Sequence, residues 1–292
     1  DVGTYYIRVA PGASSTSANY SLNVSAFENL KSDILWRNYA TGENGIWQLS
    51  GTSLETSSYI QAATEVNWAI QGSGDFNRDG QADLLWRNYK TGENAVWLMN
   101  GAVSFDSIYL QPTIDLNWQI QGTGDFNRDG KVDIVWRNYQ TGENAVWLMD
   151  GTVRTASVYL QSVNDSNWHI QGAGDFNGDG KTDLVWRNYG TGQNAIWLLN
   201  GAIFSTGIYI DPVDDPNWII SGVGDFNNDG QTDLLWRNYG SGQNAIWLLN
   251  GTTYSSGFYI NPVSDTNWRS LSPFVRTVEP TPISVAGNAL AN

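Results

Sequence analysis

The chain has 292 residues, a formal net charge of −14 and a charged fraction of 15%. Its 15 lysines and arginines are too few for a surface that attracts nucleic acid, and no apolar run approaches the ~20 residues that membrane insertion requires. Because cysteine is absent, disulfides and thiolate metal sites are excluded. The 31 glycines, 8 prolines and 15 tryptophans favour an all-β protein of short strands and tight turns.

The first predicted elements are two short strands, at residues 3–9 and 19–25. They resemble the last two strands of a bacterial pre-peptidase C-terminal type β-sandwich. This resemblance implies that residues 1–26 are the trailing strands of an upstream β-sandwich domain.

A repeat of 50 residues occupies most of the remaining chain. The string Trp-Arg-Asn-Tyr recurs five times without an insertion, and its tryptophans are Trp36, Trp86, Trp136, Trp186 and Trp236. Two further series have the same period: Trp47, Trp97, Trp147, Trp197 and Trp247, and then Trp68, Trp118, Trp168, Trp218 and Trp268. All fifteen tryptophans therefore belong to five copies of one structural unit.

Four strands are predicted for each copy, and the second copy shows them most clearly. Apolar runs bounded by glycine, asparagine and aspartate predict strands at 68–74, 83–89, 94–99 and near 107–111. The second strand contains Leu84-Leu85-Trp86, which predicts burial on both of its faces. Each copy is therefore expected to be a four-stranded meander.

Two turns set the expected register within a copy. The four-residue turn at 90–93 predicts that Trp86 lies opposite Trp97 as a cross-strand aromatic pair. Asn100 and Gly101 predict a type I′ turn into the fourth strand, because both residue types tolerate positive φ.

The copies are expected to stack, because a 50-residue meander cannot bury both of its faces alone. Residues 267–272 repeat the first-strand pattern after the fifth copy, whereas the first copy lacks a good strand of its own. The C-terminal strand is therefore expected to complete the first sheet, which predicts a five-bladed β-propeller at 27–275 and a flexible tail at 276–292. The alternatives are a first strand at 20–25, which lacks the Asn-Trp signature, and a linear array.

An acidic loop follows the first strand in four copies, with the pattern D-x-N-x-D-G-x-x-D. Calcium takes six to eight oxygen ligands, so side chains at positions 1, 3, 5 and 9 and a backbone carbonyl at position 7 predict one calcium ion per loop, four in all. The predicted ligands are Asp75, Asn77, Asp79, Gln81 and Asp83; Asp125, Asn127, Asp129, Lys131 and Asp133; Asp175, Asn177, Asp179, Lys181 and Asp183; and Asp225, Asn227, Asp229, Gln231 and Asp233. The first copy lacks the pattern, so no fifth ion is expected there. The alternative is a set of Asx turns without metal, in which three carboxylates would repel one another.

At these residues the chain resembles the FG-GAP or VCBS repeat family, bacterial relatives of the calcium-bearing propeller of integrin α chains. The resemblance covers about residues 27–275 and depends on GDFNxDGxxD followed by a hydrophobic strand and Trp-Arg-Asn. It implies an extracellular or cell-surface propeller in adhesion, carbohydrate recognition or accessory roles beside enzymes. Loops of this kind are also better filled at the calcium concentrations found outside cells, so a secreted or surface-bound bacterial protein is expected.

The Trp-Arg-Asn strings are also candidate ligand sites. Tryptophan faces stack on sugar rings, while arginine and asparagine offer hydrogen bonds to hydroxyl groups. The candidate residues are Trp36, Arg37, Asn38, Trp86, Arg87, Asn88, Trp136, Arg137, Asn138, Trp186, Arg187, Asn188, Trp236, Arg237 and Asn238. In the alternative, each arginine packs on a tryptophan between blades and each asparagine caps the hairpin.

The expected function is that of a secreted, calcium-stabilised module for carbohydrate binding or adhesion. The alternatives are a structural matrix or protein-interaction scaffold, and a polysaccharide-active enzyme. Catalysis has little support, because no nucleophile elbow or P-loop is present and the only histidine, His169, occupies a strand position. A glycosidase pair of acids cannot be identified from a linear sequence.

Overall fold

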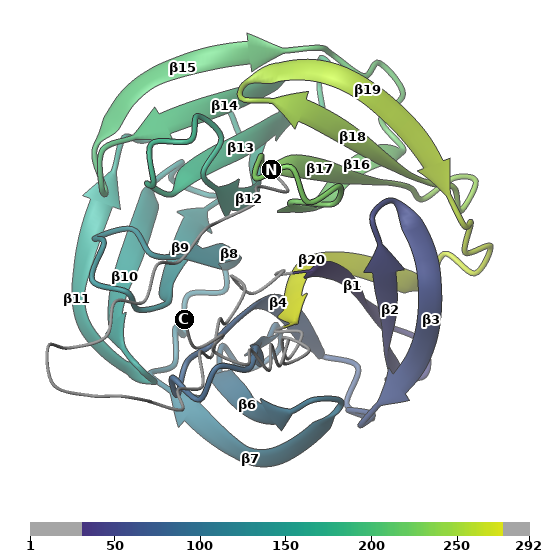
Figure 1. Cartoon of the computed structure of the whole chain (residues 1–292). Coiled ribbons are helices and arrows are strands. Elements are labelled where there is room, and N and C mark those ends of the chain that lie inside the picture. The colour runs from purple at the N-terminus through teal and green to yellow at the C-terminus, as the bar shows by residue number, and fades with distance from the viewer. Residues whose placement is uncertain (1–30, 277–292) are drawn as a thin grey trace, which may run out of the picture. The chain divides into compact units, whose positions relative to one another are not determined.

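The structure, a computed structural model, describes residues 31–276, which hold twenty strands and no helix. The strands form five antiparallel blades of four, arranged in a ring as a β-propeller (Figure 1). The predicted fold class is therefore confirmed. The predicted upstream strands at 1–26 and the predicted tail lie outside the described residues. Nothing within 31–276 forms an apolar helix of membrane-spanning length.

Each blade has an inner strand near the ring centre and an outer strand on the circumference (Figure 1). Blade 1 combines the last strand of the ring with the first three, in the order β20 (Trp268–Arg276), β1 (Lys31–Asn38), β2 (Asn44–Ser50) and β3 (Ser53–Ile60). Blade 2 holds β4 (Trp68–Gly74), β5 (Asp83–Asn88), β6 (Asn94–Asn100) and β7 (Val103–Leu110). Blade 3 holds β8 (Trp118–Gly124), β9 (Asp133–Asn138), β10 (Asn144–Asp150) and β11 (Val153–Leu160). Blades 4 and 5 hold β12 (Trp168–Gly174), β13 (Asp183–Asn188), β14 (Asn194–Leu199) and β15 (Phe204–Ile210), and then β16 (Trp218–Gly224), β17 (Asp233–Asn238), β18 (Asn244–Asn250) and β19 (Thr253–Ile260).

The hydrophobic core lies between the blades. Leu35 of blade 1 packs in one cluster with Leu84 and Trp86 of blade 2. A similar cluster lies between the two blades of each remaining neighbouring pair. All six residues of β5 are consequently buried. The succession of apolar residues in this strand is explained by its position, because both of its faces meet a neighbouring blade.

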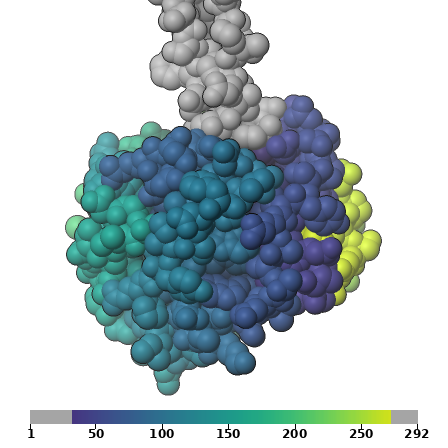
Figure 2. Space-filling view, turned by 90° about the horizontal axis from the view of Figure 1, so that it is seen from below, coloured from purple at the N-terminus to yellow at the C-terminus, as the bar shows by residue number. Residues whose placement is uncertain are grey.

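The ring is closed by the C-terminal strand, as the sequence predicts. β20 pairs antiparallel with β1, from Trp268 opposite Asn38 to Arg276 opposite Lys31. Figure 2 shows the surface of the first blade, in purple, adjoining that of the last strands, in yellow. Since β20 occupies the inner edge of β1, a strand at 20–25 cannot take that place and a linear array is excluded.

Two details of the blade differ from the prediction. The outer strand β7 begins at Val103, four residues before the predicted start, because its polar and exposed residues give no apolar run. Trp97 lies opposite Leu84, while Trp86 lies opposite Ala95. The predicted direct pair is therefore wrong in register, but the two indoles still meet diagonally, with ring centres 4.6 Å apart.

The predicted type I′ turn at Asn100 and Gly101 is also wrong. Asn100 pairs with Val103, so the two central residues of the turn are Gly101 and Ala102. Only Gly101 has positive φ, at 59°, and a positive φ at the first central residue alone is typical of a type II′ turn.

Candidate functional site

The arginines of the Trp-Arg-Asn strings lie buried between blades. Arg137 donates to the carbonyl oxygens of Gly142 and Val163 at 3.3 and 2.9 Å, and to Oδ1 of Asn144 at 3.0 Å. Gly142 belongs to the β9–β10 hairpin, and Val163 belongs to the loop that leads into blade 4. The guanidinium therefore ties one blade to the start of the next.

The same guanidinium groups lie over tryptophans of the following blade. Cζ of Arg137 is 5.2 Å from the ring centre of Trp186, and Cζ of Arg237 is 5.0 Å from that of Trp36, so the series of contacts closes around the ring. Burial is the main cause that lowers the pKa of Arg137. The carbonyl oxygens and the indole face replace the hydration that the guanidinium loses on burial.

The asparagines of the strings stabilise the hairpins. Oδ1 of Asn138 accepts hydrogen bonds from the backbone N–H groups of Gln140 and Thr141, at 2.9 and 3.1 Å. Its Nδ2 donates to Oδ2 of Asp115 at 3.1 Å, in the loop before β8. The asparagines of blades 1, 3, 4 and 5 thus join a turn to the loop that precedes the inner strand of the same blade.

The side chains of these candidate ligand residues are buried. Their tryptophan, arginine and asparagine side chains are at most 5% exposed in all five blades. Arginine and asparagine are occupied by the internal contacts above, as in the alternative that the sequence left open. Arg37 also lines a cavity of about 470 Å³ between the inner strands, and tryptophans of blades 1, 3 and 5 line further cavities.

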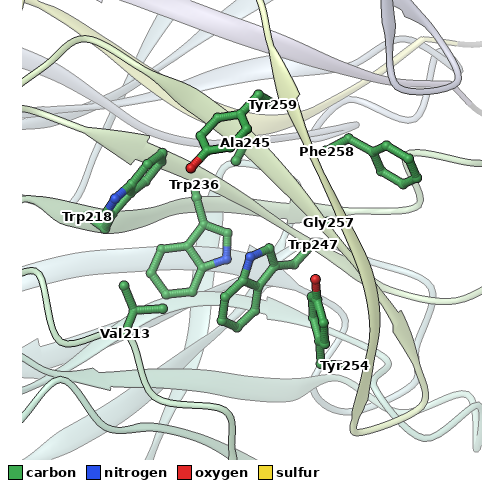
Figure 3. Close-up of a pocket in the computed structure, with 9 residues that line it drawn as sticks. All are labelled: Val213, Trp218, Trp236, Ala245, Trp247, Tyr254, Gly257, Phe258 and Tyr259. Atoms are coloured by element: carbon green, nitrogen blue, oxygen red, sulfur yellow. The ribbon is translucent and has the colours of Figure 1, made fainter.

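Apart from the cavity between the inner strands, three recesses lie on the outer wall of the propeller. In blade 5 a cavity of about 310 Å³ is lined by Val213, Trp218, Trp236, Ala245, Trp247, Tyr254, Gly257, Phe258 and Tyr259. Figure 3 shows Trp236 between Trp218 and Trp247, with its indole nitrogen on the edge turned toward Trp247. All three tryptophan series of the repeat therefore meet in one recess.

Blades 1 and 3 carry related cavities of about 220 and 210 Å³. These wall pockets, as we name the three cavities, are lined by the tryptophan triads Trp268, Trp36 and Trp47 in blade 1, Trp118, Trp136 and Trp147 in blade 3, and Trp218, Trp236 and Trp247 in blade 5. The middle indole of each triad is buried, and its Nε1–H has no hydrogen-bond partner. Each wall pocket thus combines aromatic faces with a free donor.

An exposed tyrosine beside each wall pocket was missed by the sequence analysis. Tyr59, Tyr159 and Tyr259 line the wall pockets, and Tyr259 is 73% exposed. Tyr109 and Tyr209 occupy the same place in the other blades, at 65% and 69% exposure. The signal was available, because these five tyrosines also recur every 50 residues.

The acidic loops hold convergent side-chain oxygens. In the loop at 75–83, Oδ1 of Asp75 and Oδ1 of Asn77 accept from the same N–H, that of Asp79, at 3.1 and 3.0 Å. The loops at 125–133, 175–183 and 225–233 repeat this arrangement. Positive φ at Gly80, 86°, allows the sharp turn. The carboxylate and amide oxygens at positions 1, 3 and 5 are of the ligand type that a hard cation prefers.

The closing aspartate has a different role. Asp83 is buried, its Oδ1 accepts from the N–H of Met99 and its Oδ2 from the N–H of Phe76, both at 2.9 Å. Burial raises the pKa of Asp83 to about 6, against the opposing effect of these two hydrogen bonds. Between residues 31 and 276 no three acidic or histidine side chains form a group arranged to hold a metal. Asp83 therefore supports the loop from beneath, through the backbone.

His169 lies in the inner strand β12 and packs against two tyrosines. Its ring centre is 4.5 Å from that of Tyr139 and 4.8 Å from that of Tyr189. Burial, followed by the charge of Arg137, lowers its pKa to about 4. These contacts agree with the prediction of a strand residue.

Comparisons with known proteins identify the repeat. The FG-GAP-like repeat family matches residues 75–136, 125–186 and 175–236. No curated protein matches. Among solved structures, the chain is similar to one from the crystal structure of a nidogen/laminin complex, with 13% identity, a TM-score of 0.48 and coverage of 82% of this chain and 96% of that one. It is also similar to a protein of unknown function from Bacteroides caccae, with 9% identity, a TM-score of 0.40 and coverage of 78% and 73%. With TM-scores this low, neither structure indicates a ligand for this chain.

Proposed function

The chain belongs to the FG-GAP-like repeat family, and we propose that its propeller is a carbohydrate-binding module that uses the wall pockets. The observation that carries the proposal is that each wall pocket is lined by a tryptophan with an unpartnered indole N–H, beside further aromatic rings. Sugar rings offer apolar faces for stacking and hydroxyl oxygens that accept from such a donor.

Repetition around the ring strengthens weak binding. A single small cavity with a few polar groups supports only modest affinity for one sugar unit. Three wall pockets in one rigid ring can engage a polysaccharide together, and the second contact then occurs at a high effective concentration. A repeating glycan is therefore the ligand that this arrangement suits best.

The proposal includes calcium in the four acidic loops. Asp75, Asn77 and Asp79, with their counterparts in the other three loops, would hold the ion, and calcium would supply positive charge that offsets carboxylate repulsion. The convergence of the oxygens at positions 1 and 3 on one N–H supports this assignment. Filling such loops requires abundant calcium, which supports a location outside the cell.

A protein-interaction scaffold is the second candidate function. It is favoured by exposed apolar residues in or next to the outer strands, among them Val103, Phe105, Val153 and Ile203. Calcium-dependent self-association without a glycan ligand, measured by analytical ultracentrifugation, would support this role.

A glycan array tests the main proposal. Calcium-loaded protein is expected to bind a subset of glycans that soluble sugar can compete away, and Trp247→Ala is expected to weaken the signal. Phe105→Ser is the matched control, because Phe105 is 58% exposed on the same wall but lines none of the wall pockets. A blank array with folded protein would contradict carbohydrate binding.

A further inference from the structure

The wall pockets differ at two positions of the repeat. The first position lies in the outer strand and carries Leu54, Ser104, Arg154, Phe204 and Tyr254 in blades 1 to 5. The second lies in the loop before the inner strand and carries Val263, Ala63, Thr113, Val163 and Val213. Blade 3 alone has a cation at the first position and a hydroxyl at the second, and both side chains line its wall pocket.

Arg154 forms part of the wall of this pocket. Its Cζ lies 4.6 Å from the ring centre of Trp147, and its Nη1 is 3.4 Å from Oγ of Ser157. No carboxylate between residues 31 and 276 forms an ion pair with it.

Thr113 supplies an unused polar atom in the same cavity. Its Oγ1 is buried and has no hydrogen-bond partner. Burying a hydroxyl without a partner is unfavourable, by about 1–3 kcal/mol in proteins, whereas the valine of blades 1, 4 and 5 avoids that cost. Nε1–H of Trp136 is a second unpartnered donor among the lining residues.

We propose that the wall pocket of blade 3 selects an acidic sugar, a uronic acid unit, whose carboxylate pairs with Arg154 and whose hydroxyls pair with Thr113 and Trp136. This inference rests on the proposed function and assigns a ligand class to one of its sites. A guanidinium stacked on an indole is held in place for a carboxylate and can bind it through two hydrogen bonds. The cavity of about 210 Å³ is below the ~300–1,000 Å³ of drug-sized pockets and suits a single ring.

Blade 5 is the internal contrast. Its wall pocket has Tyr254 and Val213 at the two positions, and Tyr254 lies against Trp247 with ring centres 4.9 Å apart. Aromatic stacking is retained there without a cation, so blade 5 is assigned to neutral sugars. The two wall pockets therefore share their tryptophans and differ in charge preference.

Isothermal titration calorimetry with methyl β-D-glucuronide and methyl β-D-glucoside tests the proposal on the whole chain. The wild type is expected to bind the glucuronide about tenfold more tightly at low salt, with the preference shrinking as salt screens the pair. Arg154→Ser, the blade 2 residue, should abolish the preference, and Arg154→Lys should retain most of it. Thr113→Val should weaken glucuronide binding by about fivefold, the effect of one hydrogen bond.

Several results would overturn the proposal. One is equal affinity of the wild type for the two glycosides, and another is a preference that survives Arg154→Ser. Arg154-dependent binding of tetra-aspartate in place of the glucuronide would show that the cation serves an acidic peptide. If the glucoside still binds and Trp247→Ala reduces that binding, the proposed function stands although the uronate assignment fails. If neither glycoside binds, both fail.

Discussion

The inter-blade interfaces and the outer wall follow opposite rules. At the interfaces, Trp-Arg-Asn-Tyr is the same in all five blades. Each arginine donates from Nη1 to the same glycine carbonyl and asparagine of its hairpin and lies over the tryptophan of the next blade. On the wall, the residue beside the third-strand tryptophan is leucine, serine, arginine, phenylalanine or tyrosine. Identity within the repeat thus marks packing, whereas differences mark the surface on which single blades can acquire different ligands.

Removing the closing strand should have the largest effect on the interfaces. A chain that ends at Asn267 lacks β20, so the inner edge of β1 and the cluster between blades 1 and 5 become exposed. An open ring presents an unpaired strand edge, and we expect loss of cooperative unfolding and aggregation. Calorimetry and light scattering measure both. A sharp transition at the wild-type temperature would contradict the role of β20.

Calcium removal should have the next largest effect. If each loop holds one ion, a free concentration 100-fold above Kd stabilises the fold by about 2.7 kcal/mol per site. Excess chelator is therefore expected to lower Tm by several degrees, and titration should count four ions. Asp175→Asn should reduce the count to three. An unchanged Tm in excess chelator would contradict stabilisation by calcium.

Substitution of a single inter-blade arginine should have the third largest effect on stability. Arg137→Ala removes the side-chain donor from the carbonyl oxygen of Val163 and from Oδ1 of Asn144, while the carbonyl oxygen of Gly142 keeps the N–H of Val163. At about 1–3 kcal/mol for each buried acceptor left unsatisfied, we expect a loss of about 2–6 kcal/mol in the free energy of unfolding. Arg154→Ala is the matched control on the wall and should cost less than about 1 kcal/mol, the scale of an exposed cation–π contact. Equal losses for the two variants in urea unfolding would contradict the contrast between interface and wall.

The smallest predicted effect concerns His169. Its folded pKa of about 4 lies below the ordinary 6.5, so between these values the unfolded chain binds the extra proton. Stability from this group is therefore complete above pH 6.5 and falls as pH drops toward 4. His169→Gln introduces the residue type that blade 3 has at the equivalent position, Gln119. This variant should lose the pH dependence of stability that His169 causes. A wild-type-minus-variant difference that is independent of pH would refute this.

The inner half of each blade could be predicted well from the sequence. The strand predicted at 68–74 is β4, and those predicted at 83–89 and 94–99 match β5 and β6 to within one residue, because buried strands carry continuous apolar runs between turn residues. The ring closure also followed from the extra Asn-Trp segment near Trp268. Outer strand β7 was placed too short, since half-exposed polar strands lack that pattern.

The candidate site was harder to predict, because residue type does not reveal which way a side chain points. Arg137 and Asn138 have the chemistry of sugar ligands, yet carbonyl oxygens and backbone N–H groups of neighbouring turns occupy them. Contacts between loops distant in sequence decide that outcome. The wall pockets could be recognised only when three tryptophan series and a tyrosine series were brought together in space.

The central claim is that the unpartnered indoles of the wall pockets bind sugar. Its most direct test is a two-dimensional ¹H–¹⁵N spectrum of the calcium-loaded chain during titration with methyl glycosides, with indole signals assigned by single substitutions. We predict saturable shifts of the Nε1–H signals of Trp36, Trp136 and Trp236. Binding that leaves these three signals unmoved, or no binding to any glycoside, would contradict the claim.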